Sequence, residues 1–212
     1  MSEELKPYRI EPIALSNEST VVAEFQPDAP GAREAAYQSE ADLEKDFIKQ
    51  LQMQAYEYLP ITSEADLVAN LRRQLEKLNK VILSDAEWER FFSTCIAGAN
   101  DGIVEKTARL QEDHIQVLKR DDGSTKNIYL IDKVNIHNNA LQVINQYEAN
   151  GKRATRFDVT VLINGLPMVH VELKRRGVDI REAFNQINRY QRDSFWTGSG
   201  LFEYVQLFVI SN

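Results

Sequence analysis

Asp158, Glu172 and Lys174 interrupt the apolar strands of a segment rich in valine and leucine, TRFDVTVLINGLPMVHVELKRRG, residues 155–177. Two neighbouring carboxylates repel each other, and a hard cation such as Mg²⁺, which takes oxygen ligands and keeps several waters, relieves that repulsion. Such a cation polarises a phosphoryl oxygen and activates a bound water, while a lysine can position that water or stabilise charge on the phosphate. These residue types point to phosphodiester hydrolysis. A surface salt bridge between Lys174 and one carboxylate is the alternative, because D…ExK alone is a short, common pattern.

The same segment predicts two antiparallel strands joined near Asn164 and Gly165. A two-residue turn would mix charged and apolar side chains on both faces, since a one-residue slip moves every side chain to the other face. A three-residue loop over 163–165, with Gly165 in the left-handed conformation of a bulge, separates them. The valines then share one face. The other face carries Asp158, Thr160, Met168, His170, Glu172 and Lys174.

Composition restricts the class of protein. The 212 residues carry a net charge of −7 and are 43% hydrophobic, enough for one sizeable α/β core. The acidic balance argues against nucleic-acid binding by overall charge, so such contacts must be local, as in the clusters GKRATR and KRR beside the hairpin. No apolar run approaches the ~20 residues of a membrane span. Because the N-terminus lacks a signal-peptide pattern and Cys95 is the single cysteine, we expect a cytoplasmic protein. No GxxxxGK[ST] loop is present, so no ATP site is expected.

The order of elements changes along the chain. Residues 1–38 predict an arm with one strand, and three amphipathic helices follow in DLEKDFIKQLQ, SEADLVANLRRQLEKLN and SDAEWERFFSTCI. Ser39 and Ser84 are the expected N-caps of the first and third helices. After Asn100 the pattern predicts an antiparallel meander that ends in the hairpin. DIREAFNQINRYQRDSF predicts one more helix, and YVQLFVIS predicts a buried strand. The stop directly after that strand predicts a fragment of a longer subunit.

The spacing of Asp158 and Glu172-Leu173-Lys174 resembles the PD-(D/E)xK nuclease motif, with Phe157 where the motif name has proline. RFDVTVLINGLPMVHVELKRRG followed by a helix with QINRY is similar to the N-terminal nuclease region of the restriction subunit of type I restriction-modification enzymes. That family carries a Gln-xxx-Tyr motif after its ExK strand. Upstream, SEADLEKDFIKQL and LRRQLEKLNKVILSDAEWERF resemble its first helices, so the resemblance spans roughly residues 39–212.

The resemblance implies an α/β fold with a PD-(D/E)xK restriction-endonuclease-like core, a central mixed β-sheet flanked by helices and a helical N-terminal part. Residues 39–212 would be the endonuclease domain. It also implies a type I site-specific deoxyribonuclease that cuts double-stranded DNA with Mg²⁺, after ATP-driven translocation by motor domains not in this chain. The implied partners are the methyltransferase and specificity subunits of the same complex, and no membrane. The isolated fragment is expected to be weakly active or inactive.

The resemblance also assigns roles to residues. Asp158 and Glu172 would be metal ligands, with the backbone carbonyl of Leu173, and Lys174 would serve the attacking water or the transition state. Glu44 on the first helix would approach the metal, with Glu40 less favoured, and a solvated glutamate is the alternative.

Residues around this centre have two interpretations each. Gln186 and Tyr190, four apart and so on one helix face, match the Gln-xxx-Tyr motif and would contact DNA or couple cleavage to the motor, or else form a polar helix surface. Four arginines are candidate phosphate contacts, or else keep a sheet edge soluble: Arg153, Arg156, Arg175 and Arg176.

A non-catalytic DNA-binding or subunit-docking module that retains the nuclease fold is the competing function. The joint presence of Asp158, Glu172 and Lys174 favours the nuclease. A repair exonuclease of the same superfamily would need its own helicase or end-binding motifs, and the sequence shows none.

Overall fold

The computed structural model describes residues 9–15, 21–26, 39–150, 154–175 and 199–211. The chain divides into two compact units, residues 1–38 and 39–212. In the first, strands β1 (Arg9–Leu15) and β2 (Val21–Gln26) form an antiparallel pair. The sequence predicts only one strand there, so that prediction is wrong.

The helices of the second unit follow the apolar stripes of the sequence. In the described residues they are α1 (Glu40–Met53), α2 (Glu64–Asn79), α3 (Asp85–Phe91), which continues as a π-helical turn (Phe92–Ile96), and α4 (Ile103–Gln111). The caps at Ser39 and Ser84 are confirmed, because each side chain accepts a backbone N–H of the first turn. None of these helices combines the length and apolarity needed to cross a membrane.

Helix α4 lies where the sequence predicts only strands, so the prediction for residues after Asn100 is wrong at its start. The apolar stripe of α4 is interrupted by Lys106, which is nevertheless only 1% exposed. Its ammonium donates to Gly200 O at 2.8 Å and pairs with the Glu203 carboxylate. Partners about a hundred residues away therefore make this lysine a core residue of the helix.

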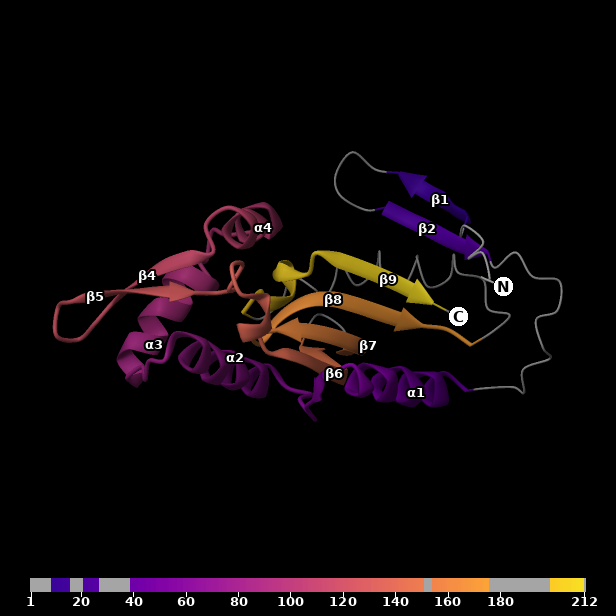
Figure 1. The fold of residues 1–212 in the computed structure, drawn as a ribbon, viewed down its shortest axis with the longest axis horizontal. Coiled ribbons are helices and arrows are strands. Elements are labelled where there is room, and N and C mark those ends of the chain that lie inside the picture. The colour runs from indigo at the N-terminus through magenta and orange to yellow at the C-terminus, as the bar shows by residue number, and fades with distance from the viewer. Residues whose placement is uncertain (1–8, 16–20, 27–38, 151–153, 176–198, 212) are drawn as a thin grey trace, which may run out of the picture. The chain divides into compact units, whose positions relative to one another are not determined.

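The main sheet is mixed, as the family resemblance implies. Its strand order is β3-β6-β7-β8-β9. The strands are β3 (Glu57–Tyr58), β6 (Leu141–Asn150), β7 (Ala154–Ile163), β8 (Leu166–Leu173) and β9 (Leu207–Ser211). The central pairs β6-β7 and β7-β8 are antiparallel, whereas β3 pairs parallel to β6. β9 is parallel to β8, as their two arrows in Figure 1 show.

Two strand predictions need correction. The expected continuous meander is interrupted, because β4 (Ile115–Lys119) and β5 (Thr125–Tyr129) form a separate two-stranded sheet. The strand expected to be buried is β9, and it is only partly covered, with Leu207 52% exposed. It is the last strand in the described sheet order, which explains why an apolar sequence does not give full burial.

The turn between β7 and β8 also differs from the expected three-residue loop. Ile163 pairs directly with Leu166, so the turn has two residues, Asn164 and Gly165, and both have positive φ (51° and 84°). The register then shifts between Val161–Val169 and the next pair toward the turn, which leaves Met168 as the extra residue of a bulge. Because of this bulge, the valines of β7 and β8 lie on the same face of the hairpin, which a two-residue turn alone would not allow.

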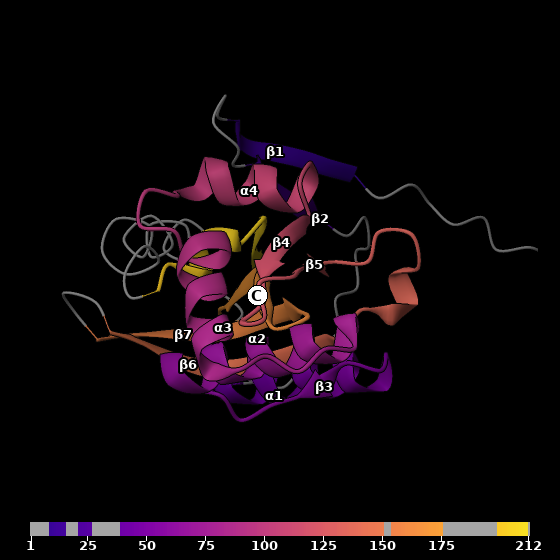
Figure 2. The same ribbon diagram turned by 90° about the vertical axis from the view of Figure 1, so that its left-hand side faces the viewer.

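Two cores result from that alternation. One lies between α1 and the central strands and contains Ile48, Leu51, Val143, Val159, Val161, Val171 and Leu173. The larger one includes Ile144, Tyr147, Phe157 and Leu162 and extends to the other helices. In both views α1 and α2 lie on one side of β6 and β7, and α4 lies on the other (Figures 1 and 2).

Candidate active site

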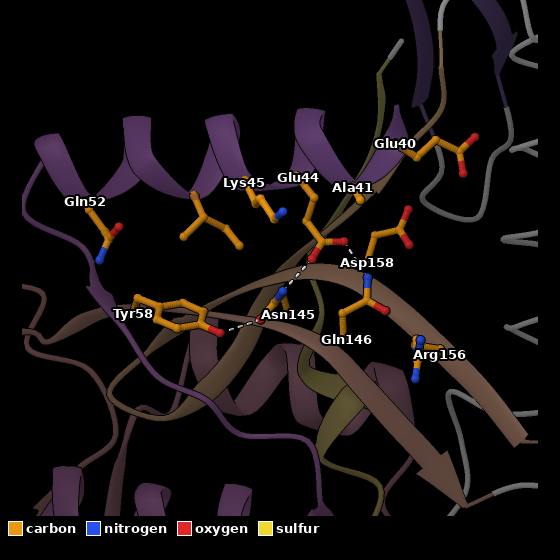
Figure 3. A pocket seen from close by; sticks show the side chains of 11 residues that line it. Glu40, Ala41, Glu44, Lys45, Gln52, Tyr58, Asn145, Gln146, Arg156 and Asp158 are labelled. Atoms are coloured by element: carbon orange, nitrogen blue, oxygen red, sulfur yellow. Dashed lines mark hydrogen bonds between the residues drawn. The ribbon is translucent and has the colours of Figure 1, made fainter. Parts of the chain in front are cut away.

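Asp158 lies on β7 at an open pocket of about 800 Å³ beneath α1. Its Oδ2 accepts the backbone N–H of Leu173 on β8 at 2.9 Å. Figure 3 shows its carboxylate pointing into the pocket toward α1. The side chain is therefore held by the neighbouring strand and still faces an opening.

Glu172 and Lys174 lie at the end of β8 and contact each other. Glu172 is fully buried, and its Oε1 accepts Lys174 Nζ at 2.7 Å. The other oxygen, Oε2, lies 3.5 Å from His170 Nε2 and accepts no hydrogen bond among the described residues. A buried carboxylate oxygen without a hydrogen bond is costly. It is suited to bind a further positive group.

The pKa of Asp158 lies above its ordinary value. Burial, and secondly the charge of Glu172, raise the pKa of Asp158 from 3.8 to about 6, against the opposing effects of the Leu173 N–H and Lys174. For Lys174, burial opposes the charge, but the hydrogen bond and charge of Glu172 prevail and hold its pKa above the usual value. The carboxylates of Asp158 on β7 and Glu172 on β8 are thus close enough for the charge of Glu172 to raise the pKa of Asp158.

The expectation that Asp158 and Glu172 share one face of the hairpin does not hold. Thr160 and His170 lie opposite each other, with Thr160 Oγ1 3.4 Å from His170 Nδ1, and Glu172 lies beside His170. The Asp158 side chain instead points toward α1. The physical reason is that β7 changes its alternation here, since Phe157 and Val159 pack in different cores.

The valine face is confirmed. Val159, Val161, Val171 and Leu173 pack together in the core beneath α1, with Val169 at its margin. The sequence therefore predicts the apolar face correctly, even though the turn is of another type.

Glu44 enters the pocket from α1. It is 8% exposed, and its two oxygens accept the side-chain amides of Asn145 and Gln146. Glu40 also lines the pocket, one turn earlier on α1, and its Oε1 accepts the backbone N–H of Arg175 at 3.3 Å. In Figure 3 Glu44 points toward the strands, whereas Glu40 points away from Glu44.

The remaining predicted residues fall into two groups. Arg156 is exposed and lines the pocket, with Nη2 3.5 Å from Glu148 Oε1. Arg175 is exposed at the end of β8. Four further candidates lie outside the described residues: Arg153, Arg176, Gln186 and Tyr190.

The donor chemistry of this site fits a magnesium ion only in part. Within the described ranges, no three acidic, histidine or cysteine side chains are grouped closely enough to hold a metal ion. Mg²⁺, however, commonly takes one or two carboxylates and completes its shell with water. The Asp158 carboxylate, which faces the pocket, and the buried Oε2 of Glu172, which accepts no hydrogen bond among the described residues, could be two such ligands.

Sequence reasoning missed the polar residues that surround Glu44. Asn145 and Gln146 hold its carboxylate, and Tyr58 Oη donates to Asn145 Oδ1 at 2.9 Å. The available signal was the pair of adjacent amides inside the apolar strand LQVINQYEA. Its meaning depends on a backbone conformation that sequence alone does not give.

Fold and site define the class of protein as an α/β domain with a mixed sheet and with carboxylates at a pocket between α1 and that sheet. Residues 37–212 match the family described as type I restriction enzyme R protein N terminus. This match covers most of the chain, and the chain therefore belongs to that family.

Curated relatives agree with this assignment. The type I restriction enzyme EcoprrI endonuclease subunit of Escherichia coli is 48% identical over 202 residues, which are 95% of this chain and 64% of that protein. The SsaAORF53P endonuclease subunit of Staphylococcus saprophyticus is 44% identical over 181 residues, 83% of this chain and 19% of that protein. The HindI endonuclease subunit of Haemophilus influenzae is 28% identical over 197 residues, 82% of this chain and 18% of that protein. The chain thus spans less than two thirds of each of these relatives.

Proposed function

We propose that this domain is the Mg²⁺-dependent nuclease of a type I restriction enzyme and hydrolyses phosphodiester bonds of double-stranded DNA, with a PD-(D/E)xK-type core. The observation that carries the proposal is the pair of neighbouring carboxylates on β7 and β8: Asp158, with a pKa raised to about 6, and the buried Glu172 bound to Lys174. Family membership supports the class of reaction.

Each residue has a separate task in this proposal. Asp158 and Glu172 hold the cation, together with the backbone carbonyl of Leu173, and Glu44 faces the same pocket from α1. When bound, the cation polarises a phosphoryl oxygen and lowers the pKa of a water. Lys174, whose pKa is held above its usual value, stays protonated and donates a hydrogen bond at the site. It would orient the attacking water or stabilise negative charge on the phosphate.

DNA would be held by local basic groups, since the chain has a net charge of −7. Arg156 is exposed at the pocket and Arg175 follows the strand that carries Glu172 and Lys174. Gln186, Tyr190, Arg153 and Arg176 remain proposed DNA or coupling contacts. ATP-driven translocation, recognition of the DNA sequence and methylation would belong to motor domains and to specificity and methyltransferase subunits. The isolated domain is expected to cut DNA weakly or not at all.

The test compares two lysine variants of the complete endonuclease subunit, assembled with its methyltransferase and specificity subunits. With Mg²⁺ and ATP, Lys174→Ala should reduce the rate of DNA cleavage about 10²–10⁴-fold, the typical contribution of a positioned proton donor or acceptor. Lys49→Ala, which alters an exposed lysine of α1, is the matched control and should cut like the parent. Equal cleavage by all three proteins would remove Lys174 from the mechanism and favour the docking module.

A further inference from the structure

The alternation of side chains between the two faces of the sheet breaks at Gln146 on β6 and at Asp158, which lies opposite it on β7. In a regular strand, residues two or four apart face the same side. Yet Tyr147 and Phe157 pack in the larger core, whereas Val143 and Val159 pack in the core beneath α1. The backbone of Gln146 is left-handed, with φ 53°. Both strands therefore change face at this point.

The break brings adjacent side chains to one carboxylate. Asn145 Nδ2 donates to Glu44 Oε1, and Gln146 Nε2 donates to Glu44 Oε2. Neighbouring side chains of a regular strand point to opposite faces, so they could not both reach Glu44. Asp158 lines the same pocket, beside these amides (Figure 3). The left-handed residue thus coincides with the place where Glu44 and Asp158 come together.

The network extends one step further from the pocket. Tyr58 Oη donates to Asn145 Oδ1 at 2.9 Å, which orients the amide so that its Nδ2 faces Glu44. Three side chains from β3 and β6 therefore determine where the Glu44 carboxylate lies. Each carboxylate oxygen that accepts one amide N–H keeps a second lone pair for another partner.

We infer that Gln146 is a positioning residue of the proposed nuclease site: its left-handed backbone turns Asp158 toward α1, and its amide, with that of Asn145, aims Glu44 at the cation. This inference rests on the proposed function and adds to it Glu44 and the residues that hold it. A non-glycine residue in the left-handed region costs roughly 1–3 kcal/mol, and such strain is concentrated at functional sites. Hydrogen bonds to a metal ligand, when removed, typically reduce metal affinity or activity about 10–100-fold.

The decisive variant is Gln146→Gly in the complete subunit, assembled with its partners. Glycine accepts a positive φ, so the strand keeps its path while the amide is removed. DNA cleavage is measured against free Mg²⁺, held in excess over ATP. The concentration for half-maximal cleavage should rise about 10–100-fold, and saturating Mg²⁺ should recover much of the rate. ATP hydrolysis by the complex should stay unchanged.

A second variant and a control make the result independent of folding at one position. Asn145→Ala removes the other amide and should shift the Mg²⁺ dependence in the same direction. Gln52→Ala changes an exposed glutamine at the same pocket, for which no described contact with Glu44 exists, and should match the parent. A purely structural role would lower the amount of active complex without changing the Mg²⁺ concentration at half-maximal cleavage, and that result would overturn the inference.

Asp158→Asn in the same assay separates this inference from the proposed function. If Asp158→Asn abolishes cleavage while both amide variants show the Mg²⁺ dependence of the parent, the positioning role is wrong and the nuclease assignment stands. If Asp158→Asn cleaves like the parent, the nuclease assignment itself fails.

Discussion

At the scale of single residues, the site is organised around charge that the fold alone does not balance. Glu172 is completely buried, and one of its oxygens accepts no hydrogen bond from the part of the chain that the structure describes. Burial, together with the charge of Glu172, raises the pKa of Asp158 to about 6. Lys174 contacts Glu172 directly and lowers the pKa of Asp158 only in part. A domain selected for stability alone would remove such a group, whereas a domain that binds a cation and a phosphate benefits from keeping it.

The raised pKa of Asp158 gives a prediction for stability. An acid whose pKa is higher in the folded state than in the unfolded state binds more protons when folded, so its contribution to stability is lost as pH rises from about 4 to about 6. Without Mg²⁺, Asp158→Asn should therefore stabilise this chain at pH 7 and have little effect at pH 4. Because the carboxyl is partly exposed, we expect about 1 kcal/mol, less than the full shift would give, or about 2–4 °C in Tm.

Thermal unfolding followed by circular dichroism at several pH values measures this effect. Glu89→Gln, which neutralises an exposed carboxylate of α3, is the control and should show no such trend. A Tm of Asp158→Asn that is lower than that of the parent at pH 7 would show that the carboxylate stabilises the fold.

At the scale of elements, the two-residue turn between β7 and β8 determines how this hairpin packs against α2. A Cβ added to Gly165 would lie 2.6 Å from Leu71 Cα, and the φ of Gly165 is +84°. Gly123, in the turn between β4 and β5, has nearly the same φ of +83° but has nothing within 4 Å of such a Cβ. A comparison of substitutions at Gly123 and Gly165 therefore separates the cost of a left-handed backbone from the cost of a steric clash with α2.

Gly123→Ala should therefore cost about 1–2 kcal/mol, the penalty of the left-handed region for an L-residue. Gly165→Ala should cost the same plus about 1–3 kcal/mol, because the turn must move away from α2. Urea unfolding of both variants gives the comparison. Equal destabilisation would mean that the hairpin turn does not pack closely on α2.

Several of these elements could be predicted, for local reasons. The leucine stripe of α2, the caps at Ser39 and Ser84 and the valine face of the hairpin all follow from periodicity and short-range hydrogen bonds. Helix α4 could not, because Lys106 interrupts its stripe and its partner Glu203 is distant in sequence. The type of turn could not be predicted either. A two-residue turn followed by a bulge at Met168 places the valines on the same face as a three-residue loop would.

The same distinction applies to the site. The roles proposed for Asp158, Glu172 and Lys174 come from their residue types and spacing, and they stay a prediction. The arrangement of these residues could not be predicted, because the left-handed Gln146 interrupts the alternation on which face assignments depend. Local patterns thus select the candidate residues, and a backbone irregularity decides where their side chains point.

At the scale of the whole molecule, the chain is one part of a larger assembly in this account. The relatives it matches are longer, and the chain spans 64% and 19% of the first two. Motor domains would supply ATP-driven translocation and most of the contact with DNA, which agrees with the net charge of −7. Cleavage and ATP hydrolysis should therefore be separable by a substitution in this domain.

The most direct test is DNA cleavage by the complete complex with Glu172→Gln, measured together with its ATP hydrolysis. Glutamine keeps the shape of Glu172 but removes the negative charge that would bind the cation and Lys174. We predict that double-strand cleavage falls below about 1% of the parent rate, as expected from losing a metal ligand, while ATP hydrolysis stays within about twofold. Cleavage at the parent rate with intact ATP hydrolysis would contradict the assignment of the nuclease site.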